Sequence, residues 1–522
     1  MGAQLKYANG IQSFEKMRTG GYAYVDKTAD IYRLVTSGSY YFLSRPRRFG
    51  KSLLLSTIEE FFRGNRALFS GLAIDSLAPE PWEEHPVLLF DMNPADYVNG
   101  ENEIEGRLGD VIEHYETKYG IPPSDKSLAR RFDTLIRTCH EKTGKRVVIL
   151  IDEYDKPILD AMGDEVLEEK NRTILKAFYG TVKSNDRHIR FFMLTGVGKL
   201  GNVNVFSGFN NIEDITFSTK FSTMCGITEQ ELHDVYHPGV VALAEEEGWT
   251  VEEAYAELKR YYDGYHFAKD LTDVYNPYSL ILALKAPEIQ SYWYQTGTPS
   301  YLLKALSGQR LSVDMFENQE RSLDSLSFAD VTRDNIVNTL YYTGYLTITR
   351  YDRRNKSVVL GFPNEEVRIG FMNNLLDVLT HSDMGGRYSL MAGMRDAIED
   401  EDVDGLMERM RSFYSQFPSV LAGKNEAHYH DVFMAACGAM GFEVRAETPS
   451  SHGVSDLELF TKRTIYIFEF KVDSTPEEAL RQIETQDYAL RYSHDTRTVM
   501  LIGVNFSSST RNIEAWVGKR NS

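Results

Sequence analysis

Cysteine is scarce in this sequence, and long apolar runs are missing from it. The chain of 522 residues contains only Cys139, Cys225 and Cys437, which are far apart. Such spacing provides neither a disulfide framework nor a zinc site, and it fits a reducing compartment. The longest aliphatic run is VVILI at 147–151, and the N-terminal MGAQLKYANG has no apolar signal region. We therefore expect a cytoplasmic protein without a membrane-spanning segment.

Basic charge is also in short supply. Lysine and arginine together number 57 against 76 aspartates and glutamates, which gives a formal net charge of −19. A protein that held nucleic acid over most of its surface would carry a basic surface. Any contact with nucleic acid must therefore be local. A chain of 522 residues is also too long for one ordinary core, so we expect about three domains.

Short apolar strands alternate with amphipathic helical patterns through the first 200 residues. This alternation predicts an α/β fold with a parallel sheet. From about Gly226 the pattern is mainly helical, with strand-like segments near 344–363, and strand patterns return after an acidic stretch at 396–405. That acidic stretch is typical of a solvated helix face or a connector, so we use it as a boundary marker. The strand candidates are SYYFL (39–43), PVLLFDM (86–92), RVVILID (146–152), IRFFMLTG (189–196), GFEVRAE (441–447), VSDLELF (454–460), TIYIFEFKV (464–472) and TVMLIGVNF (498–506).

The loop SRPRRFGKS ends with Gly50, Lys51 and Ser52. The usual phosphate-binding loop, G-x-x-x-x-G-K-[ST], has a glycine where this chain has Arg45. A strand pattern precedes the loop and the helical pattern KSLLLSTIEEFF follows it, which is the context the motif needs. There, backbone N–H groups and the helix N-terminus bind phosphate, Lys51 reaches the β and γ phosphates, and Ser52 ligates Mg²⁺. The alternative is a chance tripeptide on a basic loop.

The segment VVILIDEYD matches the second half of a nucleotide-hydrolysing site. Its apolar strand ends in Asp152 and Glu153. In such sites the first carboxylate holds the Mg²⁺ shell and the second activates water. Thr195, at the end of the next predicted strand, is placed to sense the γ-phosphate. The alternatives are an acidic turn after a strand and an ordinary strand-terminal threonine.

The C-terminal segment TIYIFEFKV carries Glu469 and Lys471 two residues apart. On a strand both project to one face, and the other face is apolar, which is typical of a central strand. Asp456 lies on the preceding predicted strand. Two carboxylates on neighbouring strands offer oxygen ligands to Mg²⁺, and a lysine beside them can orient or deprotonate water. The alternative for Glu469 and Lys471 is an exposed salt-bridged pair.

Several segments together resemble a known family. They are YVDKT (24–28), FLSRPRRFGKSLLLSTIEEFF (42–62), LIDEYDKPI (150–158), VFSGFNNIEDIT (205–216) and YYDGYHF with VYNPYSL (261–280). In this order they resemble the AAA-ATPase-like proteins of bacteria that carry a C-terminal PD-(D/E)xK nuclease-like domain. The arginine-rich approach to GKS is usual in that family. The resemblance covers nearly the whole chain.

The resemblance implies an α/β fold in which a P-loop NTPase parallel sheet is followed by a helical and winged-helix segment and an α/β restriction-endonuclease-like domain. The implied limits are 1–225 for the ATPase-like domain, 226–393 for the helical and winged-helix-like segment, 394–423 for an acidic helical connector and 424–522 for the nuclease-like domain. It also implies that Glu426 is an additional acidic ligand and that Gln482 and Tyr488 are accessory residues.

These arguments predict two sites. The nucleotide-binding residues are Arg48, Phe49, Gly50, Lys51, Ser52, Asp152 and Thr195. The catalytic residues are Glu153 in the first site and Asp456, Glu469 and Lys471 in the second. The Mg²⁺ ligands are Ser52 and Asp152 in the first site and Asp456, Glu469 and Glu426 in the second.

The predicted function is that of an ATP-binding protein, an ATPase, coupled to a Mg²⁺-dependent nuclease-like domain that contacts nucleic acid locally. The cofactors are ATP and Mg²⁺. The alternative is a nucleotide-dependent switch whose nuclease fold binds nucleic acid or a partner without cleaving. DNA and RNA both remain open as substrates, and so does a homo-oligomer.

Overall fold

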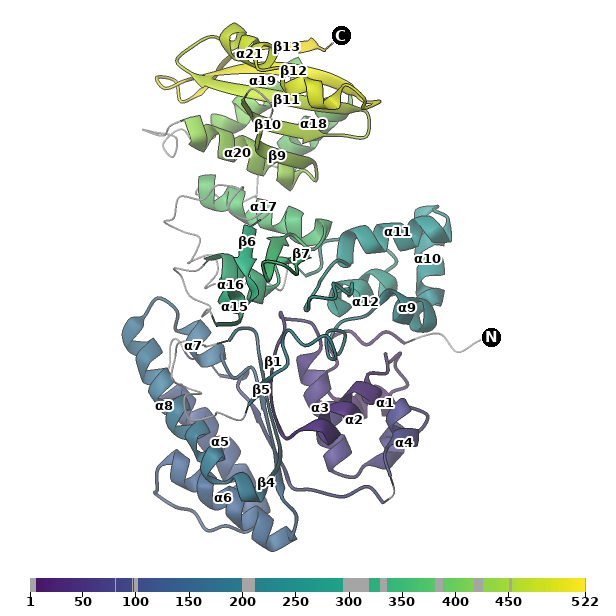
Figure 1. Cartoon of the computed structure of the whole chain (residues 1–522), viewed down its shortest axis with the longest axis vertical. Helices are drawn as coiled ribbons and strands as arrows, with labels where there is room; N and C mark the ends of the chain where they lie inside the picture. The colour runs from purple at the N-terminus through teal and green to yellow at the C-terminus, as the bar shows by residue number, and fades with distance from the viewer. Residues whose placement is uncertain are drawn as a thin grey trace. The chain divides into compact units, whose positions relative to one another are not determined.

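The structure is a computed structural model. Figure 1 shows the whole chain, coloured from the N-terminus to the C-terminus. The chain divides into two compact units, Met1–Ala305 with Gln319–Glu366, and Leu306–Asn318 with Val367–Ser522. The residues that the structure describes are 6–79, 81–95, 97, 102–199, 212–293, 319–328, 336–380, 388–416, 426–449 and 453–521.

The first unit contains a parallel sheet of five strands in the order β2-β3-β4-β1-β5. Its strands are β1 (Tyr40–Ser44), β2 (Val87–Asp91), β3 (Val147–Asp152), β4 (Ile189–Gly196) and β5 (Glu213–Asp214). Every residue of β1 and β3 is buried, because helices cover both faces of a parallel sheet. The predicted α/β fold is confirmed. Parallel strands end at one edge, where ligands bind in such sheets.

Helices pack on both faces of this sheet (Figure 1). Neighbouring strand residues point to opposite faces, so Phe192 enters the core with Phe132 and Phe178, whereas the Phe191 ring lies 5.4 Å from Phe62. The helices are α1 (Phe14–Thr19), α2 (Thr28–Ser37), α3 (Lys51–Phe62), α4 (Ala73–Leu77), α5 (Glu103–Lys118), α6 (Leu128–Thr143), α7 (Lys156–Asp160) and α8 (Glu165–Ser184), with short 3-10 turns η1 (Arg66–Phe69) and η2 (Asp186–His188).

The rest of the first unit is mainly helical, as predicted, and includes a three-stranded antiparallel sheet, β6-β8-β7. Helix α11 begins at a capping box in which Thr250 and Glu253 satisfy each other's backbone N–H groups. The elements are α9 (Glu229–Glu231), the π-helix η3 (Leu232–Tyr236), α10 (His237–Glu247), α11 (Val251–Tyr262), α12 (Pro277–Lys285), β6 (Gln319–Ser322), α15 (Leu323–Phe328), α16 (Ile336–Thr343), β7 (Thr347–Asp352) and β8 (Ser357–Gly361).

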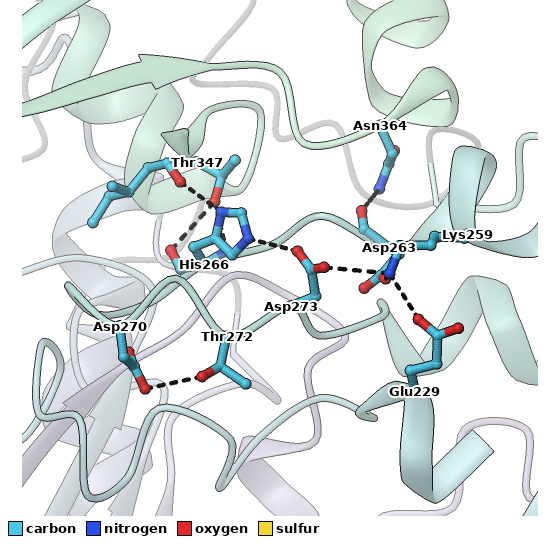
Figure 2. A network of polar contacts seen from close by, with 10 residues as sticks. Glu229, Lys259, Asp263, His266, Asp270, Thr272, Asp273, Thr347 and Asn364 are labelled. Carbon is cyan, nitrogen blue, oxygen red and sulfur yellow. Dashed lines mark hydrogen bonds and ion pairs between the residues drawn. The ribbon is translucent and has the colours of Figure 1, made fainter. Parts of the chain in front are cut away.

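A polar network fixes the segment between α11 and α12 (Figure 2). His266 Nδ1 donates to the carbonyl of Ile348 in β7 at 2.6 Å, and His266 Nε2 lies 2.6 Å from Asp273 Oδ1. Lys259 of α11 donates to Asp273 at 3.3 Å and to Glu229 of α9 at 2.7 Å. The network therefore joins two helices, the connecting segment and the small sheet.

The second unit contains a sheet in the order β13-β12-β11-β10-β9, with β11 in the centre as predicted. Phe470 of β11 meets Phe433 of α20, and Ile467 on the other face of the strand packs with Ile483 of α21. The strand β13 was not predicted. The elements are β9 (Glu443–Pro449), β10 (Val454–Phe460), β11 (Thr464–Val472), β12 (Thr498–Ser507), β13 (Asn512–Arg520), α18 (Tyr388–Glu399), α19 (Val403–Tyr414), α20 (Glu426–Ala439), α21 (Pro476–Thr485) and η5 (Tyr488–Tyr492), and α17 (Glu365–Thr380) begins in the first unit.

The acidic stretch 396–405 forms the end of α18, a turn and the start of α19, where Asp402 caps the helix. Both helices bond to the C-terminal sheet. The Tyr466 hydroxyl donates to the carbonyl of Ile398 at 2.6 Å, and Arg411 donates to the carbonyl of Ile513 at 2.9 Å. The α18–α19 hairpin is therefore part of the second unit.

Candidate functional site

The loop between β1 and α3 has the shape of a phosphate-binding loop. Gly50 has a φ of 88°, a left-handed conformation that glycine adopts at low cost, and α3 begins at Lys51. Lys51 Nζ donates to the carbonyls of Arg45 at 3.1 Å and Pro46 at 3.2 Å. The ammonium group is therefore held over the loop, at the N-terminus of a helix whose free N–H groups favour an anion.

Arg45, which stands where the general motif has glycine, is a buried structural residue. Its guanidinium donates to the carbonyls of Ser44 at 2.8 Å, Thr216 at 2.9 Å and Phe221 at 3.1 Å. It also lies 4.2 Å from the centre of the Phe267 ring. The side chain thus satisfies backbone carbonyls of distant segments. This structural role explains why the loop has arginine in place of the first glycine of the general motif and still ends in Gly-Lys-Ser.

Phe49 and Arg48 face the segment that the polar network fixes. The Phe49 ring lies 4.8 Å from Tyr265 and 5.2 Å from Phe267 between ring centres. The Arg48 guanidinium lies 4.7 Å from the centre of the Tyr278 ring at the start of α12. Both residues were predicted to bind nucleotide. In the structure Phe49 is buried and Arg48 is exposed, and both line the cavity described below.

The predicted residues Asp152 and Thr195 meet at the carboxyl edge of the parallel sheet. The Thr195 hydroxyl donates to Asp152 Oδ1 at 2.6 Å, and the Ser52 side chain lies near the same carboxylate. Burial raises the pKa of Asp152, and the charge of Glu153 adds to this, while the two hydroxyl groups lower it. Glu153 Oε1 lies 3.3 Å from Lys51 Nζ. The two halves of the predicted nucleotide site are therefore brought together.

A cavity of 340 Å³ opens over this constellation. Its lining includes residues of the phosphate-binding loop and cationic residues from several elements. Its other walls come from the N-terminal segment, from 224–227 and from α12. The cationic lining residues are Lys27, Arg47, Arg48, Lys51 and Lys156, and the apolar and aromatic ones include Ala8, Ile11, Tyr24, Met224, Tyr236, Tyr278 and Ile281. This lining suits a ligand with an anionic end and an apolar end.

The second predicted site lies on β10 and β11 of the C-terminal sheet. Leu457 of β10 pairs with Phe468 of β11, and Asp456 and Glu469 are the residues next to this pair. Residues that pair across antiparallel strands share a face. Asp456 Oδ2 accepts a hydrogen bond from the Phe470 N–H at 2.7 Å, and Lys471 Nζ lies 2.9 Å from Glu469 Oε1. The three predicted residues are thus placed on one face of the sheet.

The predicted accessory residues lie on the same side. The Gln482 amide of α21 is 3.4 Å from the Tyr488 hydroxyl. Burial raises the pKa of Tyr488, and the charges of Glu469 and Asp456 raise it further. Tyr488 is therefore close to both carboxylates. Glu426 is the first residue of α20, but its side chain lies outside the described residues.

Comparisons with known proteins agree with this arrangement. Residues 8–206 match the family described as "Predicted AAA-ATPase", and residues 424–516 match the "PD-(D/E)XK nuclease superfamily". A protein of Azotobacter chroococcum mcd 1, described as "Uncharacterized protein in vnfD 5'region", is 34% identical over 525 residues, which cover 97% of this chain and 98% of that protein. The chain belongs to the AAA-ATPase-like family with a C-terminal PD-(D/E)XK nuclease domain.

The donor atoms of both sites fit the Mg²⁺ expected of this ATPase–nuclease architecture. Ser52 and Asp152 offer a hydroxyl and a carboxylate that lie near each other, and Asp456 and Glu469 offer two carboxylates on neighbouring strands. In the described ranges, histidine, cysteine and acidic side chains form no group of three or more that could hold a metal ion. Nor does any described helix have the length and apolar character needed to cross a membrane.

Three polar residues next to these sites were missed by sequence reasoning. Asp155 belongs to the acidic turn after β3, is buried, and accepts hydrogen bonds from backbone N–H groups after β4. His430 of α20 donates from Nε2 to the carbonyl of Asp456 at 2.8 Å. Glu458 is fully buried and accepts a hydrogen bond from the Tyr492 hydroxyl at 2.6 Å. Their partners are distant in sequence, so no local pattern could have identified them.

Proposed function

We propose that the first unit binds ATP with Mg²⁺ in the 340 Å³ cavity and hydrolyses it. The observation that supports this most is the meeting of Lys51, Ser52 and Asp152 at the carboxyl edge of a parallel sheet, under a cavity with several cationic side chains. Aromatic and aliphatic lining residues, such as Tyr278 and Ile281, would contact the base. The ATPase-like domain is proposed to extend over 1–225 and the helical and winged-helix-like segment over 226–393.

The residues of this site have separate proposed roles. Lys51 binds the β and γ phosphates, and Ser52 and Asp152 hold Mg²⁺, which neutralises charge on the phosphate oxygens. Glu153 orients and deprotonates the attacking water. Thr195, already bonded to Asp152, is placed to report on the γ-phosphate.

We further propose that the C-terminal unit cleaves nucleic acid with Mg²⁺ at Asp456 and Glu469, and that ATP controls this activity. Lys471 would act on the water and on the charge that develops at the phosphate. The acidic chain, with its net charge of −19, supports a contact with nucleic acid that is local to this domain. The proposed limits are 424–522 for this domain and 394–423 for the acidic connector, whose helices also bond to the C-terminal sheet, in a bacterial cytoplasmic setting.

A second candidate function is a nucleotide-dependent switch whose nuclease fold binds without cleaving. One observation favours it: both proposed acidic ligands already have protein partners. Asp456 accepts from the Phe470 N–H, and Glu469 is paired with Lys471. Lys471 would compete with a cation for the Glu469 oxygen that it contacts, which disfavours metal binding.

Cleavage assays on DNA and RNA, single- and double-stranded, distinguish the two functions. Each substrate is incubated with the full chain, with and without ATP, in Mg²⁺, Mn²⁺ or EDTA, and phosphate release is measured in parallel. We expect metal-dependent cleavage that changes with ATP and is altered in Glu153→Gln. ATP hydrolysis without cleavage of any substrate would favour the switch. The absence of both activities would contradict the proposed enzyme.

A further inference from the structure

The acidic turn after β3 is tied to the end of β4 by four hydrogen bonds. The Tyr154 N–H donates to the carbonyl of Thr195 at 3.1 Å, and the Tyr154 hydroxyl donates to the carbonyl of Gly198 at 3.0 Å. The Asp155 carboxylate accepts from the N–H groups of Val197 at 3.0 Å and Gly198 at 2.7 Å. The turn and the strand end therefore form one hydrogen-bonded unit.

The contact is close, and Asp155 lies at its centre. A Cβ atom on Gly196 would lie 2.5 Å from Asp155 Oδ1 and 2.7 Å from the Tyr154 ring, so only glycine fits there. Asp155 is fully buried, and burial raises the pKa of its carboxyl group to about 7. A buried carboxylate is costly unless hydrogen bonds compensate for the lost water, and the two N–H groups supply them. Asp155 is thus built into the interior, whereas Glu153 lines the cavity.

Glu153, between these anchored residues and β3, has an unusual backbone conformation. Its φ is 52°, in the left-handed region that residues with a Cβ atom rarely adopt. Such a conformation persists when the surroundings fix it. On one side the Glu153 N–H donates to Asp152 Oδ1 at 3.1 Å, and on the other side Tyr154 and Asp155 are bound to β4 and the residues after it. The Glu153 carboxylate reaches Lys51 from this position.

We propose that Asp155 is a positioning residue that, by binding the N–H groups of Val197 and Gly198, holds Glu153 in the left-handed conformation that presents its carboxylate beside Lys51. Its consequence for catalysis rests on the proposed ATPase function, in which Glu153 activates water. The same bonds make the end of β4, with Thr195, move together with Glu153. A change at either element is thereby passed to the other.

The conformational part is tested without nucleotide by a double-mutant cycle in the full chain. Glycine adopts a positive φ freely and alanine does not. With Asp155 present, the Glu153→Ala variant should therefore be less stable than Glu153→Gly, and its equilibrium constant for unfolding should be about fivefold or more higher. In an Asp155→Asn background, where a neutral amide oxygen replaces the charged acceptor of both N–H groups, this difference should shrink to about twofold or less. An unchanged difference in that background overturns the proposal.

Glu116→Gln is the matched control, because Glu116 is also a buried acid of the first unit, paired with Arg131 at 2.6 Å and remote from the turn. It should destabilise the chain and leave the difference between glycine and alanine at 153 intact. If Asp155→Asn does not fold, Tyr154→Phe, which removes the hydroxyl that donates to Gly198, replaces it in the cycle. The difference should then shrink by a smaller factor, and no shrinkage overturns the proposal.

The catalytic part is tested by the rates. Asp155→Asn should lower kcat for ATP about tenfold or more and leave ATP affinity within about twofold, because Asp155 positions Glu153 and does not bind phosphate. Wild-type kcat in Asp155→Asn overturns the positioning role while the ATPase stands. A shrinking difference in the cycle, with no hydrolysis by the wild-type chain, supports the positioning role and rejects the proposed ATPase.

Discussion

The two proposed sites use the same pair of side chains in different settings. Lys51 lies 3.3 Å from Glu153, and Lys471 lies 2.9 Å from Glu469. Lys51 is only 3% exposed and also donates to two loop carbonyls, whereas Lys471 is 23% exposed. The first lysine is fixed by a loop that lines a cavity, and the second lies near the end of β11, the central strand of its sheet.

This contrast shows two ways of assembling a charged site. In the first unit, left-handed residues such as Gly50 and Glu153 and a buried Arg45 set the course of the backbone, so distant segments determine the site. In the second unit, the register of two neighbouring strands is enough to bring Asp456 and Glu469 to one face. We therefore expect the first site to depend on backbone supports and the second mainly on the side chains themselves.

The largest expected effect is on cleavage by the second unit. Asp456→Ala or Glu469→Ala should lower metal-dependent cleavage about 1000-fold or more, because each removes a charged oxygen donor. Lys471→Ala should lose most of the rate while still binding metal. Calorimetry with Mn²⁺ and initial cleavage rates provide the readouts, and Glu443→Ala, at an exposed position on β9, is the control. Cleavage that survives in Glu469→Ala would reject this site.

The next effect is on the stability of the first unit. Arg45→Ala leaves three buried carbonyl groups without their donor and should cost roughly 4 kcal/mol in the free energy of unfolding. Arg445→Ala is the matched control, since Arg445 forms an exposed pair with Glu443 in the second unit and should change stability by about 0.5 kcal/mol or less. Urea unfolding measures both. Equal losses of unfolding free energy in Arg45→Ala and Arg445→Ala would contradict the contrast between the two units.

A smaller effect concerns pH and Glu366, at the end of the first unit. Its carboxyl group accepts a hydrogen bond from the Trp293 N–H at 2.7 Å, and burial raises its pKa from 4.5 to about 7. The folded state therefore binds the proton more tightly than the unfolded state, and stability falls as pH rises from 4.5 to 7, by up to about 3 kcal/mol.

Glu366→Gln removes this proton and should flatten that part of the pH dependence. Urea midpoints of the wild type and the variant, taken at several values between pH 4.5 and 8, provide the measurement, with Glu257→Gln, at a partly exposed position, as control. Parallel curves for wild type and Glu366→Gln would show that Glu366 is ionised in the folded chain.

Sequence reasoning found those features that depend on local patterns. The strands β1 to β4 and β9 to β12 were recognisable from their apolar residues. The Gly50-Lys51-Ser52 motif follows the apolar strand β1, and Asp152 ends the apolar strand β3. The family and the α/β class are confirmed. The roles assigned to the site residues stay predictions.

The remaining features depend on contacts between distant segments. Arg45 donates to the carbonyls of Thr216 and Phe221, and Asp155 accepts from backbone N–H groups after β4. Neither role can be predicted from the neighbouring residues in the sequence. The strand β13, NIEAWVGKR, lies at the edge of its sheet and mixes apolar and charged residues, which hides its period.

Binding of ATP by the first site is the central claim, and calorimetry with ATP and Mg²⁺ tests it most directly. The wild-type chain should bind one ATP. Lys51→Ala should weaken binding about 30-fold or more, because it removes the cation that meets the β and γ phosphates, and Glu153→Gln should bind within about twofold of the wild type. Equal ATP affinity in the wild type and Lys51→Ala would contradict the account.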